Sequence, residues 1–157
     1  MSIHSNSIEC LSFDDVLIYP GYSDLESRSE ANTCVSLKHL DFKHPIISAN
    51  METVTEDQMA YAMFCNGGLG IIHRYNTVNE QRELIKNMLE KMQHQHTEYL
   101  AAAVGVKDLQ KRLDMLLYQG VKIICLDVAH AHSKLTQDAI EFINLTRSRQ
   151  NILLIVG

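Results

Sequence analysis

The stretch PIISANMETVTEDQMAYAMFCNGGLGIIHR, residues 45–74, contains one complete unit of a parallel α/β fold. It reads as an apolar strand, a turn rich in hydroxyl and amide side chains, a helix, a pair of glycines and a second apolar strand that ends in His-Arg. The same layout returns in AAAVGVKDLQKRLDMLLYQGVKIICLDVAHAHS, residues 101–133. In both segments polar side chains follow a strand, and in a parallel α/β fold this is the end where ligands bind.

From residue 45 onward, predicted strands and helices alternate strictly. The strands are continuous apolar runs, as is typical of strands buried on both faces, and cover 46–49, 69–73, 101–106, 122–127 and 152–156. The helices cover about 56–66, 78–93, 107–119 and 134–149. Apolar side chains form a stripe on the second and third helices, at Leu84, Ile85, Met88, Leu89 and Met92 and at Leu109, Leu113, Leu116 and Leu117. Gly67 and Gly120 follow helix ends, where a left-handed residue favours glycine.

Residues 1–44 are predicted to form an N-terminal arm with short strands. The segment FDDVLIY, residues 13–19, suits a short strand that Pro20 and Gly21 then turn. The segment 34–37 could pair with that strand. Residues 45–157 form the second predicted region.

The composition excludes several classes of function. The 157 residues can bury one core of ordinary size, and 46% hydrophobic with 21% charged residues is typical of a globular domain. A net charge of −5 with scattered Lys and Arg does not indicate nucleic-acid binding. No apolar run approaches the roughly 18 residues of a membrane helix, and the N-terminus lacks a secretory signal. We therefore expect a cytoplasmic protein with free thiols that binds neither nucleic acid nor membranes.

The strict β-α order predicts a parallel sheet that is either doubly wound or closed into a barrel. The dinucleotide fingerprint G-x-G-x-x-G follows none of the predicted strands, which counts against a doubly wound Rossmann domain. A (β/α)8 barrel has eight strands and about 250 residues. The barrel interpretation therefore makes residues 45–157, with five strands and four helices, the first half of a (β/α)8 TIM barrel.

Five motifs in register together resemble the IMP dehydrogenase/GMP reductase family. They are LSFDDVLIYPGYS at 11–23, PIISANMETVTE at 45–56, GGLGIIHR at 67–74, AAAVGV at 101–106 and LDVAHAHS at 126–133. The resemblance implies a TIM barrel that binds a purine nucleotide and a nicotinamide cofactor at its C-terminal face. It also implies covalent attack by a cysteine in the second half of the barrel, and none of the four cysteines here matches that motif.

The resemblance favours one branch of this family. Dehydrogenases usually carry two CBS modules between the second helix and the third strand, whereas residues 75–100 are only 26 residues that one helix fills, so the CBS insertion is absent. LESRSE at 25–30 and HRY at 73–75 resemble reductases. We therefore expect a GMP reductase, which converts GMP to IMP and ammonia with NADPH. The alternatives are an IMP dehydrogenase without CBS modules, which converts IMP to XMP with NAD, and a catalytically inactive half-barrel fragment. The family also implies a homotetramer and a monovalent cation in the complete enzyme.

Asp127 is the strongest single candidate for a catalytic residue. It closes the apolar strand IICLD, where a carboxylate is costly unless it has partners. The resemblance implies that Asp127 contacts the cofactor or the reacting group and that Val128, Ala129 and His130 lie along the cofactor. The alternative is a helix cap or a paired structural acid. His130 and His132 beside Asp127 do not amount to a metal site, because no further ligand is in evidence.

Three further residues follow predicted strands. Arg74 is the second catalytic candidate, and because a guanidinium keeps its proton it would donate hydrogen bonds or stabilise charge. A solvated strand-end arginine is the alternative. The resemblance places Asn50 and Met51 beside the substrate base, whereas without it they would be a turn residue and a core residue.

Several residues are predicted to have structural roles only. Thr53 and Thr55 are candidate caps of the first helix, and Ser133 is the candidate N-cap of the fourth. Cys65 and Cys125 are interpreted as small core hydrophobes.

Overall fold

The computed structural model describes residues 10–147 and 151–157, which fall into two compact units divided between Asn32 and Thr33. In the first unit the described residues form two short 3₁₀ helices, η1 (Phe13–Asp15) and η2 (Arg28–Glu30). The strand predicted over 13–19 is therefore wrong, because residues 13–15 form η1 and residues 16–19 have no regular secondary structure. The cause is local: the Asp15 carboxylate accepts a hydrogen bond from the Ser12 amide at 2.8 Å, and this capping interaction turns the chain.

The second unit begins with an antiparallel hairpin of β1 (Val35–Leu37) and β2 (Leu40–Phe42). The expectation that 34–37 pairs with 13–19 is thus wrong, because the partner of β1 is the strand that immediately follows it. This hairpin contributes Leu40 and Phe42 to a core cluster with side chains of the main sheet.

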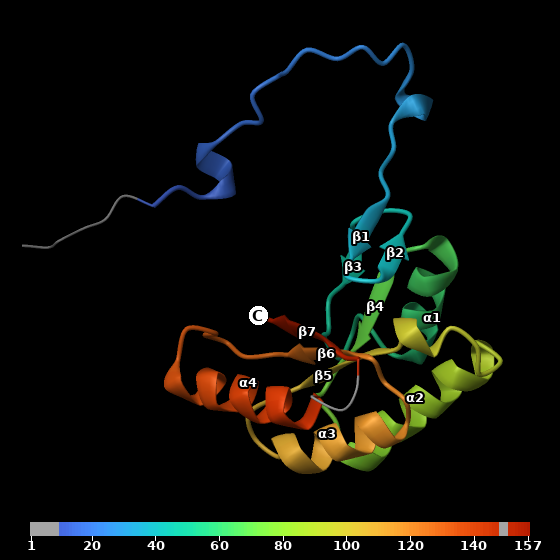
Figure 1. The fold of residues 1–157 in the computed structure, drawn as a ribbon, viewed down its shortest axis with the longest axis vertical. Coiled ribbons are helices and arrows are strands. Elements are labelled where there is room, and N and C mark those ends of the chain that lie inside the picture. The colour runs from blue at the N-terminus through green and yellow to red at the C-terminus, as the bar shows by residue number, and fades with distance from the viewer. Residues whose placement is uncertain (1–9, 148–150) are drawn as a thin grey trace, which may run out of the picture. The chain divides into compact units, whose positions relative to one another are not determined.

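The main sheet has five parallel strands in the order β3-β4-β5-β6-β7, which is also their order in the sequence (Figure 1). Their bounds are β3 Ile47–Ser48, β4 Leu69–Ile72, β5 Ala101–Val104, β6 Ile123–Leu126 and β7 Leu153–Val156. In a doubly wound sheet the spatial order of the strands reverses at the first strand. Here the order is sequential, which confirms the predicted half of a TIM barrel.

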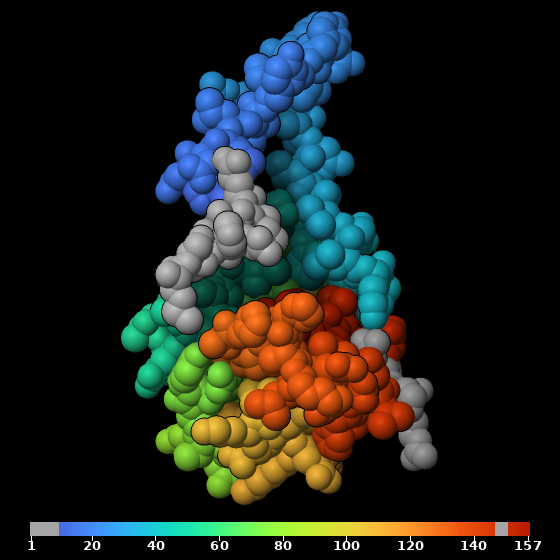
Figure 2. All heavy atoms as spheres, turned by 90° about the vertical axis from the view of Figure 1, so that its left-hand side faces the viewer, coloured from blue at the N-terminus to red at the C-terminus, as the bar shows by residue number. Residues whose placement is uncertain are grey.

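Four helices follow strands β3 to β6 in turn and pack against one face of the sheet. Their bounds are α1 Asp57–Asn66, α2 Val78–Lys91, α3 Leu109–Tyr118 and α4 Lys134–Arg147, with a short 3₁₀ helix η3 (Thr97–Tyr99) before β5. Figure 2 shows α2, α3 and α4 in green, yellow and orange on the outside of this unit. Residues 148 and 149 of the predicted fourth helix lie outside the described residues.

Strands β4, β5 and β6 are apolar throughout and buried on both faces, as is typical of inner strands of a parallel sheet. Residues such as Ile72, Val104 and Leu126 point toward the helices, whereas Ile71, Ala103 and Cys125 belong to the cluster that holds the hairpin. Successive residues of these strands belong alternately to the two clusters, because neighbouring side chains in a strand point to opposite faces of the sheet.

Glycines and capping residues set the helix boundaries. Gly67 and Gly120 have φ angles of +86° and +85°, which confirms their predicted positions after α1 and α3. Ser133 Oγ accepts a hydrogen bond from the Thr136 amide at 3.3 Å, as predicted for a cap of α4. Thr53 and Thr55 do not cap α1, whose N-cap is Glu56. The Thr55 hydroxyl instead donates to the Ala49 carbonyl at 2.6 Å, because its side chain is fully buried beside the end of β3.

The described residues contain no helix with both the length and the apolarity to cross a membrane. None of the four cysteines forms a disulfide, and Cys125 is buried as predicted. Cys65 is exposed, so its interpretation as a core residue is wrong, because it lies on the outward face of α1.

Candidate active site at the carboxyl ends of the strands

Arg74 and Asp127 form an ion pair at the carboxyl ends of the strands. Arg74 lies two residues beyond β4 and Asp127 directly follows β6, and the distance from Arg74 Nε to Asp127 Oδ2 is 2.8 Å. The two side chains are 30% and 21% exposed, so the pair is partly shielded from water but still accessible. The two residues that were predicted to be catalytic are therefore brought into direct contact.

Gly105 directly follows β5, the strand between β4 and β6, and its lack of a side chain leaves room for the Arg74–Asp127 contact. A Cβ atom on residue 105 would lie 3.0 Å from both Cζ and Nη1 of Arg74, which is tighter than ordinary van der Waals contact. The arginine side chain thus crosses the end of β5 at a position where a side chain would crowd it.

The Arg74 guanidinium also lies against an aromatic ring. Its Cζ is 5.0 Å from the centroid of the Tyr75 ring, within the range of a cation–π interaction. Within the part of the chain that the structure describes, only Nε of this guanidinium is hydrogen-bonded. The two terminal nitrogens therefore remain available to donate to a ligand.

A cavity of about 350 Å³ opens beside the ion pair. Its walls come from the residues that follow β4, β5 and β6 and from the start of α4: Arg74, Val106, Lys107, Asp127, Val128, Ala129, His130, Ser133, Leu135 and Thr136. The segment 128–130, which was predicted to contact a cofactor, thus lines the same cavity as the predicted catalytic pair. Two cations, a carboxylate, an imidazole and hydroxyl groups form a set of donors and acceptors that fits a polar, negatively charged ligand such as a nucleotide.

Hydrogen bonds hold the loop between β6 and α4. The Val128 amide donates to the Gly157 carbonyl at 2.8 Å, and the Asp127 amide donates to the Val104 carbonyl, also at 2.8 Å. The Ser133 and Thr136 hydroxyls are 2.9 Å apart. The cavity wall is therefore tied to β5, to the residue after β7 and to the first turn of α4.

Asn50 and Met51 lie at the same edge of the sheet but outside this cavity. Both follow β3, Asn50 is half-buried, and Met51 is 55% exposed. The Met51 carbonyl accepts hydrogen bonds from the Val54 and Thr55 amides, each at 3.0 Å, which forms the turn before α1. Their predicted contact with a substrate base stays a prediction.

Three further residues at this edge were not predicted as site residues: Gly105, Lys107 and Tyr75. All three lie just after a strand, as Arg74 and Asp127 do, so their position in the β-α order was the available signal. Gly105 is part of the AAAVGV motif, which marks the segment without identifying the close approach of Arg74.

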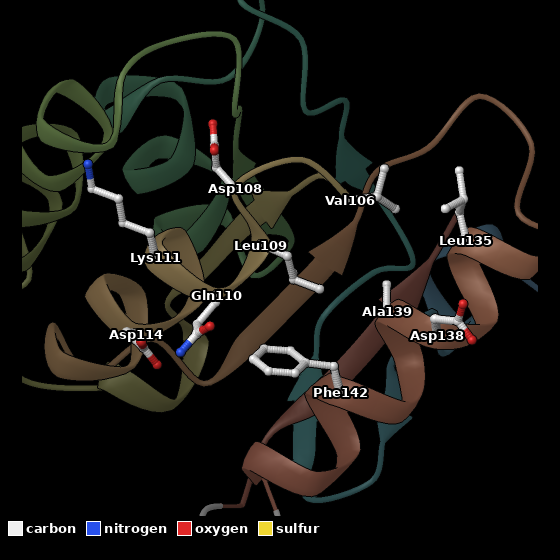
Figure 3. A pocket seen from close by; sticks show the side chains of 10 residues that line it. All are labelled: Val106, Asp108, Leu109, Gln110, Lys111, Asp114, Leu135, Asp138, Ala139 and Phe142. Atoms are coloured by element: carbon white, nitrogen blue, oxygen red, sulfur yellow. The ribbon is translucent and has the colours of Figure 1, made fainter.

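A second and larger hollow, of about 740 Å³, lies between α3 and α4 (Figure 3). Figure 3 shows Leu109 of α3 and Phe142 of α4 pointing toward this groove. Val106 and Leu135 line both hollows, so a ligand too long for the strand-end cavity could continue into the groove.

The described residues offer neither a metal site nor a reactive cysteine at this edge. No three His, Cys, Asp or Glu side chains are grouped to hold a metal ion in the described ranges 10–147 and 151–157, and the His130 and His132 ring centroids are 6.4 Å apart. Burial raises the pKa of the Cys125 thiol to about 11, and the charge of Asp127 acts in the same direction while that of Arg74 opposes it. The Cys125 thiol is therefore protonated, and unreactive, near neutral pH.

The fold and this edge define half of a parallel (β/α)8 barrel with a ligand cavity at the carboxyl ends of its strands. The sequence profile of the IMP dehydrogenase / GMP reductase domain matches residues 10–157. The chain belongs to this family of oxidoreductases that act on purine nucleotides.

The similar curated proteins are divided between the two activities. A GMP reductase of Streptococcus agalactiae serotype V is 32% identical over 139 residues, which cover 88% of this chain and 41% of the reductase. An inosine-5'-monophosphate dehydrogenase of Cryptosporidium parvum is 30% identical over 185 aligned positions, covering 94% of this chain and 45% of the dehydrogenase. The corresponding dehydrogenase of Nitrosopumilus maritimus is 50% identical over 80 residues, or 50% of this chain and 17% of its own length. The chain thus spans less than half the length of these relatives.

Proposed function

We propose that this chain forms the first half of the active site of a GMP reductase, which converts GMP to IMP and ammonia with NADPH. The observation that carries the proposal is the Arg74–Asp127 ion pair, which crosses the end of β5 beside the strand-end cavity. By analogy with the family we also propose a cytoplasmic homotetramer whose complete form uses a monovalent cation.

Two observations support the reductase branch. The connection from β4 to β5 consists of α2, η3 and short turns, which leaves no room for an inserted pair of modules. A reductase is 32% identical along 88% of the chain. The second candidate, an IMP dehydrogenase without CBS modules that uses NAD, is supported by the shorter segment of 50% identity and by a dehydrogenase that is 30% identical along 94% of the chain.

The residues at the strand ends fit a nucleotide and a nicotinamide cofactor. The bound cofactor would supply the hydride, and Arg74 and Lys107 would balance negative charge on the ligands. A guanidinium has only N–H donors, so the free terminal nitrogens of Arg74 would donate hydrogen bonds to a substrate atom that gains negative charge. Asp127 would hold that guanidinium in place through Nε and would contact the cofactor together with residues 128–130.

A fusion enzyme tests this function. Residues 1–157 would be joined to the remaining part of the Streptococcus agalactiae GMP reductase, and turnover would be followed with GMP and NADPH and, separately, with IMP and NAD. Reductase activity that falls in Arg74→Met and Asp127→Asn supports the proposal. Matched controls are Arg82→Met and Glu90→Gln, both on α2 and outside both hollows, which should leave activity unchanged.

The other outcomes separate the alternatives. Turnover of IMP with NAD alone identifies the dehydrogenase branch. A folded fusion that turns over neither pair of substrates supports the inactive fragment. Full activity in both site variants overturns the assignment of the ion pair.

A further inference from the structure

We infer that Gln81 and Arg112 form a buried clamp that positions Arg74 by holding the backbone on both sides of it. Neither residue lies in the strand-end cavity, so the clamp would act through Arg74 rather than on a ligand. The inference rests on the role proposed for Arg74, and its test includes a measurement that does not depend on activity.

Gln81 joins the ends of two neighbouring strands. Its side chain is fully buried, and its Nε2 donates hydrogen bonds to the carbonyls of His73 and Ala103, each at 2.9 Å. The paired register of β4 and β5 runs to Ile72 and Ala102, one residue before these two carbonyls. The two N–H groups of one amide therefore link the strands at the level where their ladder has stopped and where Arg74 follows.

Arg112 connects Gln81 to the turn after Arg74. Its Nη1 donates to Gln81 Oε1 at 2.9 Å, and its Nη2 donates to the Asn76 backbone carbonyl at 2.7 Å. The Asn76 side-chain oxygen accepts a further hydrogen bond from Nη1 at 3.2 Å. The carbonyls of residues 73 and 76, on either side of Arg74, are thus held by one connected network from α2 and α3.

The turn itself is fixed from within by His73. The His73 imidazole is 2% exposed, and its Nδ1 accepts a hydrogen bond from the Tyr75 amide at 3.1 Å. Tyr75 is the residue whose ring lies against the Arg74 guanidinium. The backbone positions that determine where Arg74 points are therefore each tied to a buried side chain.

A packing role alone does not account for Arg112. The side chain is only 7% exposed, and none of the described carboxylates lies within 4.0 Å of it. Burial lowers the pKa of its guanidinium, Asp108 opposes this effect, and the charge of Arg74 adds to it. A buried cation is costly compared with an apolar residue of similar size, so its hydrogen bonds to the 73–76 turn are what distinguish it from a core side chain.

The test uses the Nε–H proton of Arg74, which is bonded to Asp127. In the purified chain, the exchange of this proton with solvent would be followed by ¹H–¹⁵N NMR in the wild type, Gln81→Met and Arg112→Met. We expect exchange to become at least about fivefold faster in both variants, the ratio that corresponds to the net free energy of one hydrogen bond. Arg112→Lys, which keeps the charge and some donors, should show a smaller increase and serves if the other variants fail to fold.

Leu113→Val is the matched control for lost stability. Leu113 follows Arg112 on α3 and is fully buried in the core, so this variant should lower the melting temperature without accelerating Arg74 exchange. Unchanged exchange in all the clamp variants would overturn the clamp, and so would an equal acceleration in Leu113→Val.

The fusion enzyme separates the clamp from the function proposed for Arg74. The clamp variants should lower kcat more than they raise KM, and adding them to Arg74→Met should have no further effect, because both changes act through one side chain. If Arg74→Met is fully active, the proposed function fails while the exchange measurement still decides the clamp. If the effects of Arg112→Met and Arg74→Met on kcat are additive, Arg112 acts independently of Arg74 and the clamp is refuted.

Discussion

The ion pair between Arg74 and Asp127 should stabilise the folded chain by an amount that a double-mutant cycle can measure. The variants are Arg74→Met, Asp127→Ala and the combination of both. Met keeps most of the aliphatic stem that crosses the end of β5, and Ala leaves no acceptor, so the coupling free energy reports the pair itself.

The magnitude follows from the geometry of the contact. Exposed ion pairs contribute about 0.2–1 kcal/mol, and hydrogen bonds to charged groups contribute about 1.5–3 kcal/mol. Here one hydrogen bond of 2.8 Å joins side chains that are 30% and 21% exposed, so solvent screens the charges in part. We therefore expect a coupling free energy of about 1 kcal/mol at low salt, near the boundary of the two ranges.

Urea unfolding of the four proteins, with the slope m checked for constancy, gives the coupling free energy. It should decrease in 1 M NaCl, where the screening length falls to about 3 Å. The pair of Lys134 and Asp138, at 2.7 Å and with side chains 74% and 52% exposed, is an internal comparison. Its coupling should be smaller than that of Arg74 and Asp127, because both of its side chains are largely exposed to solvent. A coupling for Arg74 and Asp127 that is zero, or one that does not respond to salt, would refute the reasoning.

Four other outcomes are expected. In the fusion enzyme, Asp127→Asn should lower kcat on the order of 10²-fold while the thermal melt stays the same, because a side chain of the same size loses its charge beside the reacting groups; a lower melt with normal kcat would make Asp127 a structural acid. Residues 1–157 expressed alone should show no turnover of GMP with NADPH or of IMP with NAD, because the strand-end cavity contains no cysteine; activity that survives removal of Cys125 and Cys65 would contradict this. The pKa of Cys125 is raised from 9.0 to about 11, so its contribution to stability is complete below pH 9 and is lost as the pH rises through about 11; urea titrations over this range should show a larger loss in the wild type and in Cys10→Ala than in Cys125→Ala. Gly70→Ala should destabilise the chain by about 1–3 kcal/mol or more in the same assay, because the new Cβ would lie 2.4 Å from the Ala60 Cα; an unchanged urea midpoint would show that α1 can move away from β4.

The order of the strands could be predicted from the sequence because buried parallel strands are continuous apolar runs, and each of the five runs became a strand. The predictions of secondary structure and of caps were wrong where a local hydrogen bond competed with the hydrophobic pattern. Ser12 and Asp15 turn a segment that is rich in strand-forming residues, and Thr55 uses its hydroxyl on the end of β3 instead of on α1. The hydrophobic periodicity of the sequence contains no information about either of these hydrogen bonds.

The sequence identified individual residues of the candidate site but did not predict which of them are in contact. Asp127 and Arg74 each stood out as a charge at the end of an apolar strand. Their contact depends on the register of three strands and on the missing side chain of Gly105, and a single sequence does not report such distances.

The sequence did contain a signal for the proposed clamp. Gln81 lies four residues before Ile85 and seven before Met88, so it falls on the apolar stripe of α2, and Arg112 lies four residues before Leu116 on the stripe of α3. Polar side chains at core positions of two neighbouring helices must find partners in the interior, and the partners nearest to the carboxyl ends of the strands are the backbone carbonyls that the ladder leaves unpaired. The same requirement that satisfies these buried groups therefore fixes the turn that carries Arg74. In a parallel barrel, a polar residue on the apolar stripe of a helix near the end of a strand is for this reason a candidate positioning residue even when it touches no ligand.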